Sequence, residues 1–297
     1  MNCLININRK LMEHGINIGK VNRILSLLLS EDIEAFGSKP KCLLISGASG
    51  SGKTRLANIL KQVSTRIMST IDSKDLSEVG YSGKDPSSIF EKLIYSSGGD
   101  CKVAAKGIVH LDEFDKLSAS FSIEKDVNGI GIQQSLLKPL DGIEIGIVNP
   151  NPSRANPNPT LNLDTSGMIF VFTGSFSGKK ISCPKDLMSS GFIPELANRI
   201  DFFLHLKEPS EDELYKMARD DEFYEKAVKF AKSKDVNISF DDSFKLILAS
   251  EAFKLGGHYR SVSYLFNNIV YDKIVELIIS REKSYEFSKY DLEGEND

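Results

Sequence analysis

Short apolar runs alternate with helical patterns along the first two thirds of the chain. Residues 42–45, 107–111 and 168–172 are mostly apolar runs of a length that is typical of buried strands. Residues 56–63 place apolar side chains at the i, i+3, i+4, i+7 spacing of a helix that packs along one face. Strands that alternate with helices favour a mostly parallel sheet with helices on both faces. We therefore expect an α/β fold.

Three more helices are predicted in this part of the chain. Helical spacing indicates one at about 18–30, and another runs over 86–95 with a proline in its first turn. A third, short helix is expected at 133–140, entered through Gly129 and Gly131. These helices are the expected cover of the sheet.

The hydrophobic pattern changes near residue 208. Ser210 and Glu213 have the spacing of a capping box at a helix N-terminus, and the apolar residues beyond them keep helical spacing. We therefore expect two domains, a large α/β domain at 1–207 and a small, mostly helical domain at 208–297. Charged residues dominate the tail from 281 onward, which has little to bury and is expected to fray or to be disordered.

Composition and charge narrow the function classes. The chain has 297 residues, 41% of them hydrophobic and 26% charged, which is ordinary for a globular protein with an ample core. Its net charge of −4 argues against the broad basic surface that nucleic-acid binders use. The four cysteines form no C-x-x-C pair, so neither a zinc site nor a disulfide framework is expected. No apolar run has the length of a membrane span, and we expect a cytoplasmic protein.

The sequence GASGSGKT at 47–54 fits the G-x-x-x-x-G-K-[ST] phosphate loop and lies between a predicted strand and a predicted helix. Its glycines let backbone N–H groups turn toward phosphates at the helix N-terminus, where the helix dipole also favours negative charge. Lys53 is expected to meet the β- and γ-phosphates, and Thr54 to bind Mg²⁺. The residues of this loop that are expected to bind a nucleoside triphosphate are Gly47, Ser49, Gly50, Ser51, Gly52, Lys53 and Thr54.

The predicted strand at 107–111 leads into two carboxylates, Asp112 and Glu113. A phosphate-loop ATPase needs one carboxylate to hold Mg²⁺ through water and a second to polarise the attacking water. We therefore assign Asp112, together with Thr54, to the Mg²⁺ site and Glu113 to the role of catalytic base. The chain is thus predicted to hydrolyse a nucleotide.

With these motifs in place, the chain resembles the ClpX-type protein unfoldases of the AAA+ superfamily over roughly residues 16–275. The matching stretches are LISGASGSGKT at 44–54, LSEVGYSGKD at 76–85, GIVHLDEFDKL at 107–117, DVNGIGIQQSLLKPLDG at 126–142, DTSGMIFVFTGSF at 164–176 and GFIPELANR at 191–199. The resemblance implies an AAA+ large domain followed by a small helical domain, and ATP with Mg²⁺ as the cofactors.

In that family six subunits form a ring, and an aromatic residue in a glycine-flanked loop grips an unfolded polypeptide in the axial pore. The resemblance implies that Tyr81, with Gly80 and Gly83 beside it, has this role here. The alternative is an aromatic side chain that covers a local apolar patch. The implied partners are a protein substrate and further copies of this chain in a hexamer.

The resemblance also assigns residues around the nucleotide. Arg199 matches the arginine finger that completes the ATP site of a neighbouring subunit, and a surface salt bridge is its simpler alternative. Arg260 matches the sensor arginine of the small domain, and Thr173 stands at the position of the strand-end sensor. Ile18 has the position of a residue that faces the adenine, with a place in the core as its alternative.

Three departures from the family pattern bear on the partners. We expect no zinc-binding N-terminal module, because its cysteine pairs are lacking. Residues 176–191 lack the hydrophobic tripeptide loop by which ClpX docks its peptidase, so a ClpP-type partner is not expected. The basic entry loop is replaced by the asparagine- and proline-rich segment 149–159, an expected irregular loop with Arg154 as its one cation. These departures favour a remodeller that works without an attached peptidase.

Two other functions remain open from the sequence alone. A DNA-associated AAA+ motor or loader has the same fold, but the acidic balance of the chain and the glycine-flanked tyrosine argue against it. A nucleotide-dependent assembly scaffold would switch with ATP without moving polypeptide. The sequence separates this scaffold from a remodeller poorly.

Overall fold

The computed structural model of the chain describes residues 2–13, 19–30, 39–76, 87–119, 127–150, 159–219, 222–256 and 258–293. The chain forms two compact units. The first consists of Met1–Ala48 and Gly52–Leu206, and the second of Ser49–Ser51 and Lys207–Asp297. No helix within the described residues is long and apolar enough to cross a membrane.

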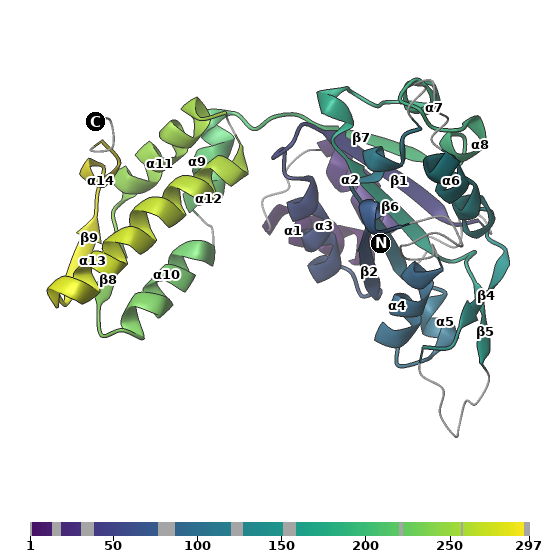
Figure 1. The fold of residues 1–297 in the computed structure, drawn as a ribbon, viewed down its shortest axis with the longest axis horizontal. Coiled ribbons are helices and arrows are strands. Elements are labelled where there is room, and N and C mark those ends of the chain that lie inside the picture. The colour runs from purple at the N-terminus through teal and green to yellow at the C-terminus, as the bar shows by residue number, and fades with distance from the viewer. Residues whose placement is uncertain are drawn as a thin grey trace. The chain divides into compact units, whose positions relative to one another are not determined.

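A five-stranded parallel sheet forms the centre of the first unit, with the strand order β2-β3-β6-β1-β7 (Figure 1). Its strands are β1 Lys41–Gly47, β2 Met68–Asp72, β3 Ile108–Asp112, β6 Ile169–Gly174 and β7 Phe202–Leu206. The three predicted apolar runs are β1, β3 and β6, so the predicted parallel sheet of an α/β fold is confirmed. These three strands are almost wholly buried, which explains why their sequences are continuous rather than alternating.

Successive residues of each strand point to opposite faces of the sheet, and helices cover both faces. Leu43 and Ile45 of β1 join a hydrophobic cluster on one face, whereas Cys42 and Leu44 join the cluster on the other. The first face is covered by α1 Asn2–Glu13, α2 Gly19–Leu28 and α3 Lys53–Val63. The second is covered by α4 Ser88–Ser96, α5 Cys101–Ala104, α6 Val127–Leu140, α7 Pro184–Met188 and α8 Pro194–Ala197.

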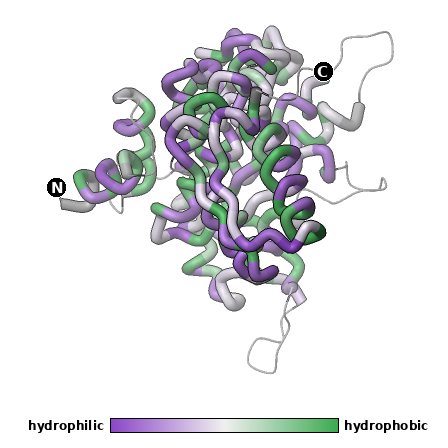
Figure 2. The backbone as a smooth tube through the Cα atoms, turned by 90° about the vertical axis from the view of Figure 1, so that its left-hand side faces the viewer, coloured by the Kyte–Doolittle hydropathy of each residue, from purple (hydrophilic) through white to green (hydrophobic). Residues whose placement is uncertain are grey.

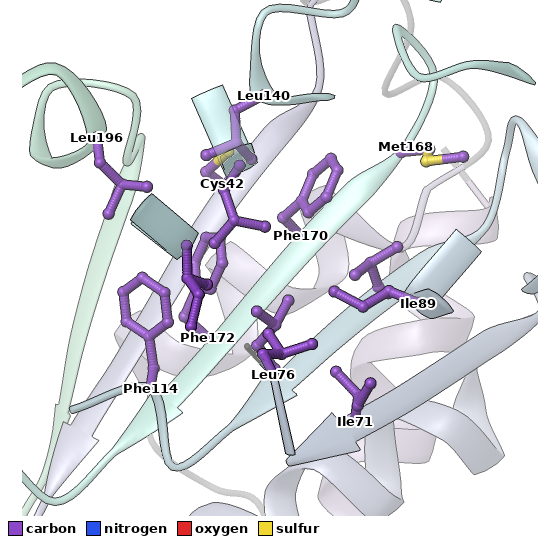
Figure 3. Close-up of a cluster of buried hydrophobic side chains, with 14 of the residues drawn as sticks. Cys42, Ile71, Leu76, Ile89, Phe114, Leu140, Met168, Phe170, Phe172 and Leu196 are labelled. Carbon is purple, nitrogen blue, oxygen red and sulfur yellow. The ribbon is translucent and has the colours of Figure 1, made fainter. Parts of the chain in front are cut away.

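Aromatic packing on the second face holds the turn that follows β3. Figure 3 shows Phe114, just beyond β3, beside Phe172 of β6 in the buried cluster. The centroids of these two rings are 4.3 Å apart, and Phe114 also stacks on Phe192 at 4.8 Å. Each buried aromatic side chain contributes about 2 kcal/mol through the apolar surface that it removes from water. The backbone at Glu113, the one residue between β3 and Phe114, is therefore anchored by the core packing of Phe114.

Helix α6 is longer than predicted, because it begins at Val127 and has Gly129 and Gly131 inside it rather than before it. A glycine within a helix costs roughly 1 kcal/mol relative to alanine. Ile132 and Leu136 are buried in the cluster on the second face, and this tertiary packing outweighs the glycine cost.

Several elements of this unit are not predicted by the sequence pattern, among them its first helix and a hairpin. Helix α1 forms because Ile7 and Leu11, one helical turn apart, are both buried. The antiparallel hairpin of β4 Glu144–Val148 and β5 Thr160–Asp164 borders the segment that is expected to be an irregular loop. Residues 151–158 of that segment, which include Arg154, lie outside the described residues.

The second unit is mostly helical, as predicted. Its helices are α9 Glu211–Arg219, α10 Glu222–Lys232, α11 Asp242–Lys254, α12 Tyr259–Phe266, α13 Asp272–Ser280 and α14 Tyr290–Glu293. Hydrophobic and hydrophilic residues alternate along the helices (Figure 2), as packing on one face requires. The predicted capping box is confirmed, since the Ser210 N–H donates to Glu213 Oε2 at 2.9 Å and the Glu213 N–H donates to Ser210 Oγ at 3.3 Å.

The charged tail is ordered further than predicted. Residues of the tail form β9 Ser284–Phe287, which pairs in parallel with β8 Asn237–Phe240. Phe287 is fully buried and stacks on Phe240 with ring centroids 4.9 Å apart. The prediction of a frayed or disordered tail is wrong for these residues, because one buried aromatic ring supplies the apolar surface that the charge count conceals.

Candidate nucleotide-binding site

Three neighbouring strands of the sheet end where the predicted site residues lie. Strand β1 leads into the loop 47–54, β3 ends at Asp112, and β6 reaches Thr173 one residue before its end. Thr173 lies opposite Ile45 of β1 in the parallel register, and β3 is the other neighbour of β6. The carboxyl ends of parallel strands form a common edge, where open α/β sheets bind ligands. The structure therefore brings the loop, Asp112 and Thr173 together.

The backbone of the loop suits glycine and favours an anion. Gly50 and Gly52 have φ angles of 80° and 91°, in the left-handed region that residues with a Cβ rarely adopt. Gly52 is the N-cap of α3, and no side chain of the described residues forms a capping hydrogen bond there. The first-turn N–H groups and the helix dipole therefore favour a phosphate at this end of α3. Of the two loop serines, Ser49 is exposed and Ser51 is buried.

The ammonium group of Lys53 is folded back over the loop. Its Nζ donates hydrogen bonds to the carbonyl oxygens of Gly47 at 2.7 Å and Ala48 at 2.6 Å. The positive charge therefore lies within the curve of the loop, and Thr54 is exposed on the first turn of α3. This set of amides, one ammonium and one hydroxyl fits a nucleoside triphosphate with Mg²⁺.

The Asp112 carboxylate is held by two hydrogen bonds. The Thr173 hydroxyl donates to Asp112 Oδ1 at 2.6 Å, and the Glu113 N–H donates to the same oxygen at 2.9 Å. Thr173 itself is fully buried. A carboxylate fixed in this way at a strand end is suited to hold a hydrated divalent cation.

Glu113 has a strained backbone and an ion-paired side chain. Its φ of 52° and ψ of 38° place it in the left-handed region, which is uncommon for residues other than glycine and clusters at functional sites. Its carboxylate pairs with the ammonium of Lys74, which belongs to the short 3₁₀ helix Ser73–Asp75 after β2. The hydrogen bond to Glu113 raises the pKa of Lys74. In this conformation the Glu113 carboxylate is therefore ion-paired with Lys74.

Arg199 follows α8 and forms a bidentate pair with Asp141. Its Nε donates to Asp141 Oδ1 at 2.9 Å and its Nη2 donates to Oδ2 at 2.8 Å, while Nη1 donates to the carbonyl oxygen of Glu195. The Arg199 side chain is 26% exposed, and its hydrogen bonds hold the pKa of Asp141 below its usual range. The sequence does not predict the role of Asp141, which lies 58 positions away along the chain.

The remaining predicted site residues are Arg260, which belongs to the second unit, and four residues outside the described chain. Arg260 lies in the first turn of α12 in the second unit, where its side chain is exposed. The predicted residues that lie outside the described residues are Ile18, Gly80, Tyr81 and Gly83. Their roles stay predictions.

A buried histidine beside the site is not singled out by sequence reasoning. His110 lies in the middle of β3 and is 1% exposed, and its Nε2 lies 2.9 Å from Thr173 Oγ1. Burial lowers the pKa of His110 from 6.5 to about 4, and the nearby Asp112 carboxylate opposes this shift in part. In the sequence, His110 is the one polar residue inside the otherwise apolar run 108–111, and this pattern could have identified it.

This histidine predicts a loss of stability in acid. Because its folded pKa lies below its ordinary value, the unfolded chain gains a proton near pH 6.5 that the folded chain gains only near pH 4. The stability that neutral His110 contributes is therefore fully present above pH 6.5 and is lost as the pH falls toward 4. At about 1.4 kcal/mol per pKa unit the whole loss is about 3 kcal/mol.

Urea denaturation of the wild-type chain and of His110→Gln near neutral pH and near about pH 4.5 checks this expectation. The free energy of unfolding of the wild type should fall by about 2 to 3 kcal/mol more than that of the variant. Equal losses in the two chains would show that His110 is not held neutral by the fold.

Comparisons with known proteins agree with this geometry. A family model described as AAA domain (Cdc48 subfamily) matches residues 39–203. The ATP-dependent Clp protease ATP-binding subunit ClpX of Treponema denticola is 30% identical over 291 aligned positions, which cover 86% of this chain and 69% of that protein. The protein of the same description from Porphyromonas gingivalis is 28% identical over 309 positions, which cover 91% of this chain and 74% of that protein.

Proposed function

This chain belongs to the AAA+ ATPases of the ClpX type, and on that premise we propose that it is an ATP-driven, ring-forming remodeller of a protein or protein complex. We also propose that it works without an attached peptidase. The observation that carries the proposal is the common edge of β1, β3 and β6, which the phosphate loop shares with Asp112, Glu113 and Thr173.

Each residue at this edge has a proposed part in ATP hydrolysis. ATP with Mg²⁺, when bound, supplies the phosphoryl group and a cation that offsets its charge. The loop amides and Lys53 would hold the β- and γ-phosphates, while Thr54 and Asp112 would hold Mg²⁺, Asp112 through water. Glu113 would orient the attacking water and accept its proton. Lys74 must first release the Glu113 carboxylate with which it is paired.

Arg199 is proposed to act on the ATP site of a neighbouring subunit in a ring of six. The side-chain hydrogen bonds of Arg199 within the described part of the chain go to Asp141 and Glu195, so the guanidinium is oriented on its own subunit. A bidentate carboxylate fixes both the position and the plane of such a group. We propose that Arg260 contacts the γ-phosphate as a sensor.

The absence of a docked peptidase is supported by the segment that follows β6. The short 3₁₀ helix Phe176–Gly178 and α7 Pro184–Met188 occupy it, and Ile181 between them is 2% exposed. An apolar side chain that is buried in its own subunit is not presented to a partner. We infer that this segment packs down on the subunit and does not project as a docking loop.

Substitution of Tyr81 tests whether the protein grips an unfolded polypeptide. We expect Tyr81→Ala to keep its basal ATP turnover within about twofold, because Tyr81 has no proposed part in binding or hydrolysing ATP. Unfolded casein should stimulate turnover by the wild type and fail to stimulate the variant, because the grip on the polypeptide is removed. Phosphate release with and without casein measures both effects.

Tyr95→Ala is the matched control, since Tyr95 is 65% exposed on α4. It should respond to casein as the wild type does. Full stimulation of Tyr81→Ala would contradict polypeptide threading, and stimulation by DNA in place of casein would favour the loader.

A cytoplasmic location is also proposed. The cysteines whose side chains are described, Cys42, Cys101 and Cys183, are free thiols. Burial raises the pKa of the Cys42 thiol, which keeps it protonated and unreactive. Free thiols are typical of proteins in reducing compartments.

A further inference from the structure

A line of hydrogen bonds crosses three neighbouring strands beneath the candidate Mg²⁺ site. It runs from Thr70 on β2 through His110 on β3 to Thr173 on β6, and returns to Asp112 at the end of β3. His110 Nδ1 lies 3.2 Å from Thr70 Oγ1, the residue that stands opposite it in the strand register. His110 and Thr173 are 1% and 0% exposed, so the centre of this line is shielded from water.

The carboxylate of Asp112, at one end of this line, fixes the direction of every hydrogen bond along it. An ionised carboxylate only accepts hydrogen bonds, so the Thr173 hydroxyl donates to Asp112 Oδ1. The oxygen of that hydroxyl then accepts from His110, whose Nε2 must carry the hydrogen. With Nε2 protonated in a neutral ring, Nδ1 is an acceptor and the Thr70 hydroxyl donates to it.

We propose that His110 is a positioning residue for ATP hydrolysis, whose Nε2–H holds the Thr173 hydroxyl toward Asp112 and thereby fixes the carboxylate that binds the hydrated Mg²⁺. This inference rests on the proposed ATPase function. A buried hydroxyl that lacks its donor has several rotamers, and Thr173 would then spend less time bonded to Asp112. Asp112 would keep the Glu113 N–H as its other donor, so the cation site would be loosened rather than lost.

The first test reads the tautomer of His110 without any nucleotide. In the chain labelled with ¹⁵N-histidine, long-range ¹H–¹⁵N correlation spectra distinguish a protonated from an unprotonated ring nitrogen. The chain has four histidines, and the signals that vanish in His110→Gln identify those of His110. We expect Nε2 to be protonated and Nδ1 to be unprotonated near neutral pH. A protonated Nδ1 with an unprotonated Nε2 would overturn the proposal, because Thr173 would then donate to His110 and not to Asp112.

The second test distinguishes a positioning role of His110 in ATP hydrolysis from a role in core packing alone. His110→Phe keeps a ring in the core and removes both nitrogens, so we expect kcat to fall about tenfold with the KM for ATP within about twofold. His110→Gln carries an amide N–H that reaches the Nε2 position, and it should recover most of the loss. Leu111→Val is the matched control, because Leu111 is buried on the opposite face of the same strand. It should lower stability without changing kcat.

A kcat for His110→Phe equal to that of the wild type, or an equal loss in Leu111→Val, would overturn the proposal. If the wild-type chain itself fails to hydrolyse ATP, the proposed function fails, and the tautomer spectrum still decides whether the line of hydrogen bonds exists.

Discussion

Replacement of Glu113 by glutamine is expected to slow ATP turnover by about 10²- to 10⁴-fold while ATP still binds. Glutamine has the shape of glutamate but cannot accept the proton of the attacking water. The residues that would hold the phosphates and Mg²⁺, Lys53, Thr54 and Asp112, are unchanged. Steady-state phosphate release measures the loss, and equilibrium binding of a fluorescent ATP analogue measures the affinity.

Glu225→Gln is the control for this variant, because it makes the same chemical change on an exposed turn of α10 in the second unit. Turnover by this control should equal that of the wild type. If Glu113→Gln hydrolyses ATP at the wild-type rate, Glu113 is not the base. If it loses ATP binding as well, its side chain serves the nucleotide pocket rather than the chemical step.

Replacement of Arg199 by alanine is expected to slow turnover by about 10³-fold or more, the range of arginine fingers in other nucleotide hydrolases. In the proposed role the guanidinium stabilises charge that develops on the transferred phosphoryl group, so its loss should lower kcat more than ATP affinity. Arg199→Lys should rescue little, because an ammonium group cannot form the bidentate pair that Asp141 makes with Arg199.

The same phosphate-release and binding assays check this expectation. Arg219→Ala, an exposed arginine on α9, is the matched control and should leave turnover unchanged. A residual rate within tenfold of the wild type would show that Arg199 serves the surface pair with Asp141 and not catalysis.

Local patterns account for the parts of the fold and site that are predictable from the sequence. The loop 47–54, Asp112 and Glu113 are adjacent to strands whose apolar runs reveal them, so their order along the chain already fixes their common edge. A parallel sheet can be predicted from buried apolar runs that are separated by helical patterns. The confirmed family then follows from the same stretches.

The parts of the fold and site that the sequence does not predict depend on contacts between segments that are far apart along the chain. His110 and Thr173 are 63 positions apart, and Arg199 and Asp141 are 58 apart. Such pairs depend on strand order and register, which no local spacing encodes. The burial of Phe287 is not predictable from the local sequence for a related reason, because it depends on a partner strand that begins at Asn237.

Mixing the two inactive chains tests the central claim, a site shared between subunits of a ring, most directly. Glu113→Gln retains Arg199, and Arg199→Ala retains Glu113, so a mixed interface unites one intact half from each chain. With random assortment about one quarter of the interfaces are intact, and a 1:1 mixture should regain about one quarter of the wild-type turnover per chain. Turnover of the mixture that stays at the sum of the two variants alone would contradict the shared site.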